Sequence, residues 1–151
     1  MAVTTDLGNL RDIHPRRKQE VGRRLALWAL NRAYGFKEIE CSGPLYKSMT
    51  VKDGKARLQF DHVGSGLATR DEESISWFDV SDGTGMFFSA SAQIDGSEVV
   101  LSNSQVTNPA AVRYAWHAMA QPNLINREGL PASPFSTEPD EALRQPKPPA
   151  P

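Results

Sequence analysis

The residues best suited to chemistry lie near the start of the chain, where His14 follows Asp12 and, farther back, Asp6. In a serine hydrolase a histidine accepts the proton of the nucleophile, and a carboxylate holds the imidazole in the correct tautomer. A short loop before a helix can present both groups. His14 is therefore a candidate general base, with Asp12 and Asp6 as candidate carboxylates, although taken alone His14 would equally suit a residue that merely caps the helix.

Other reactive side chains carry weaker signals. His62 and Ser65 share a glycine-rich loop that gives them no fixed geometry, which favours a structural turn over a catalytic dyad. His117 lies in an apolar segment and is interpreted as a packing or surface residue. Cys41 is the sole cysteine, so an internal disulfide is excluded. Three scattered histidines without a cysteine cluster predict no metal site.

Two blocks of sequence occur in a defined order. The first contains Thr5-Asp6-Leu7-Gly8, Asp12-Ile13-His14-Pro15 and the stretch Lys18 to Ala26, and the second contains Val112 to Trp116 and Gly129 to Phe135. Together they resemble the last catalytic block, the following helix and the terminal signature of the sialate O-acetylesterases, a carbohydrate esterase family of the SGNH hydrolase superfamily. The resemblance spans Thr4 to Thr137.

The resemblance implies a hydrolase that removes O-acetyl groups from a sugar, with a serine nucleophile, His14 as base, Asp12 or Asp6 as its orienter, and no cofactor. The Gly-Gln-Ser block of the family does not occur here, nor does a Gly-x-Ser-x-Gly elbow. Arg11 also stands where the superfamily usually places its aspartate, and Ser136 where the family often has arginine. We therefore expect a chain that is inactive alone and that needs a missing N-terminal catalytic part to act on an acetylated sugar.

The alternative is a non-catalytic β-sandwich module that binds carbohydrate or braces a catalytic domain, with His14 incidental. Five aromatic residues are candidates for a sugar platform: Trp77, Phe78, Phe87, Phe88 and Trp116. Their positions in expected strands favour the core for most of them.

A helix is expected from Pro15 to Tyr34, because proline suits a first helical position and Gly35 supplies a stop. Its C-terminal half is apolar nearly all round, which is typical of a helix buried on two sides. In the isolated chain the uncovered side predicts self-association. The arginines in its first half are interpreted as a solvated face.

Strand and turn signals begin at Leu45. Asp53-Gly54 predicts a hairpin between Lys47 to Val51 and Ala56 to Phe60. Three more strands are expected: Ile75 to Val80, Met86 to Ile94 and Val99 to Val106. Thr107-Asn108-Pro109 then predicts helical turns over Ala110 to Trp116, and prolines keep Gly129 to Phe135 extended.

The predicted fold class is α+β: a helix remnant of an SGNH α/β domain followed by an antiparallel β-sandwich-like domain. The expected division is residues 1–40 for the end of the esterase domain, 41–137 for the β-rich domain and 138–151 for a disordered proline-rich tail. Lys and Arg number 17 against 18 Asp and Glu, so neither nucleic acid nor an anionic membrane is an expected partner. No apolar run approaches the roughly 18 residues of a membrane span, and Met1 to Thr5 lack the basic and apolar regions of a signal peptide, so the localisation stays open.

Overall fold

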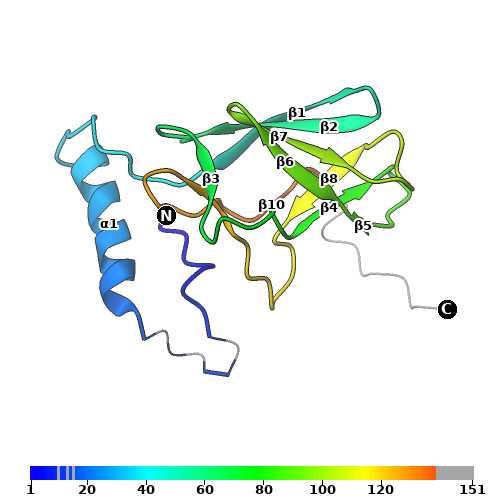
Figure 1. Ribbon diagram of the computed structural model, residues 1–151. Coiled ribbons are helices and arrows are strands. Elements are labelled where there is room, and N and C mark those ends of the chain that lie inside the picture. The colour runs from blue at the N-terminus through cyan, green and yellow to red at the C-terminus, as the bar shows by residue number, and fades with distance from the viewer. Residues whose placement is uncertain (10, 13, 15, 139–151) are drawn as a thin grey trace.

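The computed structural model describes residues 1–9, 11–12, 14 and 16–138. Over these residues a helix comes first and short strands follow, so the chain is α+β with a β-sandwich-like domain, as predicted (Figure 1). The elements are α1 (Lys18–Arg32), β1 (Leu45–Lys52), β2 (Lys55–Asp61), β3 (Leu67–Thr69), β4 (Phe78–Ser81), β5 (Phe88–Ser89), β6 (Ser91–Asp95), β7 (Glu98–Ser102), β8 (Ala111–Tyr114), β9 (Leu124–Asn126) and β10 (Phe135–Ser136).

The first sheet has the antiparallel order β1-β2-β7-β6. Its opening hairpin is the one expected from the sequence, with Lys52 paired to Lys55. Asp53 and Gly54 have φ values of 51° and 73°, as a two-residue turn that matches the twist of the strands requires. The prediction of this hairpin is confirmed.

The second sheet has the order β10-β8-β4-β5, and β3 pairs with β9 in a separate two-stranded sheet. The prediction of helical turns over Ala110 to Trp116 is wrong, because β8 lies there, paired with β4 on one side and β10 on the other. Val112 and Tyr114 are fully buried in that strand. Their β-branched and aromatic side chains fit a pleated, buried surface, and this packing overrides the capping signal before them.

The core lies between the two four-stranded sheets. Leu58 and Leu101 come from the first sheet, and Phe78 and Val112 come from the second. In β2 every second residue is buried, which is the period of a strand with one face on the core. The expected alternation therefore produces the sandwich.

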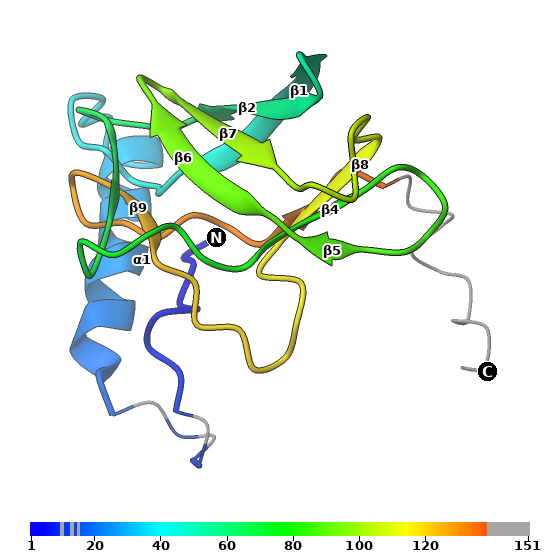
Figure 2. The same ribbon diagram turned by 45° about the vertical axis from the view of Figure 1, so that its right-hand side comes forward.

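Helix α1 stands beside one end of the β-domain, next to the N-terminal segment (Figures 1 and 2). It starts at Lys18 and ends at Arg32, inside the predicted range, and Gly35 follows with a φ of 82°. Arg24 is its buried residue, whereas Leu25 is 54% exposed. Among the described residues, no helix combines the length and apolar character that a membrane crossing needs.

The last described residue departs from the prediction of a disordered tail over residues 138–151. Glu138, assigned to the tail, accepts a hydrogen bond from Arg113 Nε at 2.8 Å. The rest of the predicted tail, residues 139–151, lies outside the described residues.

Candidate functional site

The structure places His14 and Asp12 in direct contact. Asp12 Oδ1 accepts a hydrogen bond from the backbone N–H of His14 at 2.9 Å and lies 3.1 Å from His14 Nδ1. The His14 side chain is 78% exposed and that of Asp12 is 40% exposed. In the tautomer that donates Nδ1–H to Asp12, Nε2 is left to accept a proton from a group outside this loop.

The turn before His14 is held by one hydrogen bond to a side chain and one between backbone groups. Asn9 Oδ1 accepts from the N–H of Arg11 at 3.0 Å, and the N–H of Asp12 donates to the Asn9 carbonyl at 3.3 Å. Such local bonds are what make asparagine and aspartate frequent in turns. Residues two apart share a face even in an extended chain, and the hydrogen bond from the His14 N–H to Asp12 Oδ1 brings the two side chains into contact.

Asp6 lies in a buried ion pair with Arg24. Its two carboxylate oxygens accept hydrogen bonds from Arg24 at 2.6 and 2.7 Å, and both side chains are at least nine-tenths buried. Burial alone would raise the pKa of Asp6, but the hydrogen bonds and charge of Arg24 outweigh it and lower the pKa. Arg24 also donates to the Val3 carbonyl at 2.7 Å. This pair fastens the N-terminal segment to α1.

An open hollow of about 510 Å³ lies beside the His14 loop. The residues around it come from the N-terminal segment, from the two positions just before α1 and from the connection between β8 and β9: Leu7, Gly8, Asn9, Arg11, Arg16, Arg17 and Gln121. Figure 2 shows that connection in yellow on the same side of the molecule as the blue N-terminal segment. Segments far apart in the sequence therefore border the loop that carries His14.

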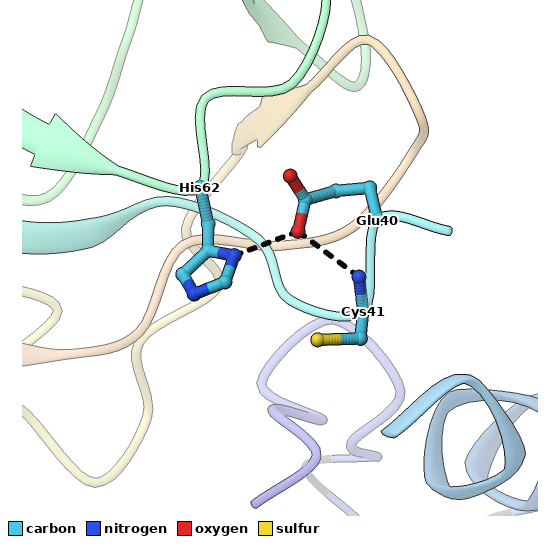
Figure 3. A group of neighbouring side chains, drawn as sticks. All are labelled: Glu40, Cys41 and His62. Carbon is cyan, nitrogen blue, oxygen red and sulfur yellow. Dashed lines mark hydrogen bonds and ion pairs between the residues drawn. The ribbon is translucent and has the colours of Figure 1, made fainter. Parts of the chain in front are cut away.

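A second group of reactive side chains consists of Glu40, Cys41 and His62 (Figure 3). Glu40 Oε1 lies 2.7 Å from His62 Nδ1 and accepts a hydrogen bond from the backbone N–H of Cys41 at 3.0 Å. The sequence predicted no metal site, because His62 lies apart from Glu40 and Cys41 in it. The predicted hairpin could have indicated this group. Its turn at Asp53-Gly54 reverses the chain, so the segment before β1, near residue 41, lies close to the end of β2, near residue 62.

The other candidate residues, His62, Ser65 and His117, make contacts outside the His14 loop. His62 faces Glu40, while the backbone N–H of Ser65 donates to Glu128 Oε1 at 2.9 Å, in keeping with a structural turn. His117 is exposed and stacks on Trp77, with the ring centroids 6.1 Å apart.

Fold and site define an α+β protein in which a histidine loop and a helix precede a β-sandwich-like domain. Comparison with family models and with curated proteins gives no match. A solved structure does match: the crystal structure of a novel carbohydrate acetylesterase from Xanthomonas citri, with a TM-score of 0.85 and 43% sequence identity. The match covers 91% of this chain and 32% of that chain, so this chain spans about a third of the length of the enzyme. The chain is thus related to a carbohydrate esterase.

Proposed function

We propose that this chain is part of a carbohydrate O-acetylesterase in which His14 is the general base and Asp12 orients it. The likeness to the Xanthomonas acetylesterase, over 91% of this chain, carries the proposal. The contact between Asp12 Oδ1 and His14 Nδ1 supports the assignment of roles, because Asp6 is bound to Arg24. The resemblance to sialate O-acetylesterases narrows the proposed substrate to an acetylated sialic acid or a related acetylated sugar.

The proposed reaction follows from the exposed imidazole. A serine hydroxyl attacks the acetyl carbonyl while His14 Nε2 accepts its proton, and the same proton then passes to the departing sugar oxygen. Water next attacks the acetyl-serine and gives a proton to Nε2, which passes it to the serine oxygen as the bond to the acetyl group breaks, so that acetate leaves and the serine hydroxyl is restored. Asp12 stabilises the imidazolium in both steps. No Gly-Gln-Ser block occurs in the 151 residues, so the nucleophile must come from a catalytic part outside them.

A chimaeric enzyme tests this function. The third of the Xanthomonas acetylesterase that matches this chain is replaced by this chain, and acetate release from an acetylated sugar is measured. We expect activity in the chimaera and a loss of up to about ten-thousandfold in turnover for Asp12→Asn, with a similar loss for His14→Ala. A folded chimaera that releases acetate equally well with and without His14 would contradict the proposal.

The isolated chain supplies the companion experiment. We expect no hydrolysis of an aryl acetate, because a base without a positioned nucleophile forfeits the covalent route and the oxyanion hole. Turnover that Ser65→Ala abolishes would assign the nucleophile to the loop after β2 instead.

A second candidate function is carbohydrate binding by the β-domain, favoured by two exposed indoles. Trp77 is 40% and Trp116 is 47% exposed, whereas Phe78 belongs to the core. Trp77 has a φ of 66° and Ala115 one of 52°, and the Ala115 N–H donates to the Trp77 carbonyl at 2.9 Å. A bulky residue at positive φ is strained, and such strain is frequent at ligand-binding sites. Exposed indoles can stack on sugar rings.

Fluorescence titration of the whole chain with an acetylated oligosaccharide tests this binding. We expect indole quenching on binding, and at least about tenfold weaker affinity for Trp77→Ala and Trp116→Ala, since a desolvated ring contributes on the order of 1.4 kcal/mol or more. Met119→Ala is the matched control, because Met119 is also exposed near these residues. Equal affinity in all variants would exclude the platform.

A further inference from the structure

Three side chains with metal-binding donors converge where the segment before β1 meets the end of β2 (Figure 3). One donor atom each from Glu40, Cys41 and His62 lies within 4.8 Å of the other two. A carboxylate oxygen, a thiolate sulfur and an imidazole nitrogen are the donors that zinc takes in proteins. The group therefore has the composition of a three-ligand zinc site.

The backbone around the group is fixed by a buried asparagine. Asn126 is fully buried, and its Nδ2 donates to the Ser42 carbonyl at 2.9 Å and to the His62 carbonyl at 3.1 Å. Its Oδ1 accepts from the Leu130 N–H at 2.9 Å, so all its polar atoms are used. One side chain thus ties the segment that carries Glu40 and Cys41 to the residue that carries the imidazole, as supporting residues do around metal ligands.

The backbone of His62 is strained, and this conformation directs its ring toward Glu40. Its φ is 60°, a region that residues with a Cβ rarely adopt. Unlike Asp53, which has a similar φ inside a tight hairpin turn, His62 lies just after the end of β2. With this backbone its ring faces Glu40, with Nδ1 2.7 Å from Oε1. Strain of this kind at a cluster of reactive groups points to a ligand.

We propose that Glu40, Cys41 and His62 bind a zinc ion, with water as the fourth ligand. The thiol of Cys41 loses its proton on binding, and two bonds to the metal replace the contact between His62 Nδ1 and Glu40 Oε1. In a tetrahedral site these two atoms would be about 3.3 Å apart, so they must separate by about 0.6 Å from their present 2.7 Å. Cys41 is buried, whereas the side chains of Glu40 and His62 are 23% exposed, which leaves an open side for water.

The position of the group indicates what the ion does. Residues 40 and 41 lie in the connection between α1 and β1, and the ring of Trp28 in α1 lies 6.2 Å from that of His62. A bond from Cys41 to an ion that His62 also holds fixes this connection to the end of β2. Zinc therefore stabilises the junction between the helix and the β-domain, independently of the proposed esterase activity.

The test uses the full chain after removal of metals with a chelator. Zinc is titrated against a chromophoric competitor, and cobalt replaces zinc for spectroscopy. We expect one equivalent of metal, a thiolate-to-cobalt charge-transfer band and affinity that rises with pH, because the thiol must deprotonate. Cys41→Ser should abolish the band and weaken zinc binding by more than about a hundredfold, and His62→Gln should weaken it similarly. His117→Gln, which changes a histidine outside the group, should bind zinc as the unmodified chain does.

Two results would overturn the proposal: the absence of the charge-transfer band in the unmodified chain, or an equal loss of zinc affinity in His117→Gln. If Cys41→Ser does not fold, Glu40→Gln decides, because its amide oxygen can still accept the backbone hydrogen bond from Cys41. Zinc binding undiminished in folded Glu40→Gln would also contradict the site.

Discussion

Replacing Asp6 by asparagine tests how much its buried ion pair with Arg24 stabilises the fold. Asparagine has nearly the same shape and can keep one hydrogen bond to Arg24, but it removes the negative charge. The Asp6 side chain is 7% exposed and that of Arg24 is 5% exposed, so the substitution leaves a buried guanidinium without its closest counter-charge. Asp6→Asn should therefore destabilise the fold.

The magnitude follows from the burial of the pair and from what remains. Removing one partner of a buried ion pair costs about 3 to 5 kcal/mol. Glu20 Oε1 still accepts from Arg24 Nε at 3.0 Å, and hydrogen bonds from Arg23 and Arg24 lower the pKa of Glu20 to about 2, so it stays charged at neutral pH. Because Glu20 still balances part of the charge of Arg24, we expect the free energy of unfolding to fall by about 3 kcal/mol, the lower end of that range.

Asp12→Asn is the matched control. The contact between Asp12 and His14 is solvent-exposed, and exposed pairs contribute at most about 1 kcal/mol. The two variants should therefore behave differently. Asp6→Asn should lose stability, whereas Asp12→Asn should keep its stability and lose turnover in the chimaeric enzyme.

The assay is urea unfolding of the isolated chain, followed by far-ultraviolet circular dichroism, to which α1 contributes. The folded-state pKa of Asp6 is below its unfolded value, so the contribution of Asp6 is complete above the unfolded pKa of about 3.9 and is lost as the pH falls through the folded pKa. The stability difference between the unmodified chain and Asp6→Asn should therefore be full at neutral pH and shrink in acid. A loss below about 1 kcal/mol at neutral pH, as for an exposed pair, would refute this reasoning.

Three further outcomes are expected. Leu58→Ala should lower the free energy of unfolding by about 2 to 5 kcal/mol in urea, because Leu58 is fully buried between the sheets; a conservative Leu58→Met should cost less than about 1.5 kcal/mol. Gly43→Ala should lower the free energy of unfolding by about 1 to 3 kcal/mol in thermal unfolding, because an added Cβ would clash with the backbone oxygen of Pro131. The isolated chain should self-associate through the apolar side of α1, as sedimentation experiments would show. Leu25→Glu should reduce this association, since Leu25 is 54% exposed. A strictly monomeric unmodified chain would contradict the prediction.

Local sequence determined the elements whose cause is local. Asp53-Gly54 predicts its hairpin because few residues tolerate the positive φ values that the turn needs. Alternating burial in β2 and the helix before Gly35 follow in the same way from the period of each element. The contact of Asp12 with His14 is also local, since Asp12 accepts a bond from the backbone N–H of His14 two residues on. The division at residues 40 and 41 stays a prediction.

Tertiary structure decided what depends on distant partners. The segment of β8 carries a capping signal, and only its place between β4 and β10 makes it a strand, because burial of Val112 and Tyr114 outweighs local propensity. The sequence offers both Asp6 and Asp12 as partners of His14, and only the fold places Arg24 against Asp6, in a buried ion pair. The predicted hairpin brings the segments of Cys41 and His62 near each other, but their exact placement also depends on the distant Asn126, which bonds to the Ser42 and His62 carbonyls and which local propensity does not encode.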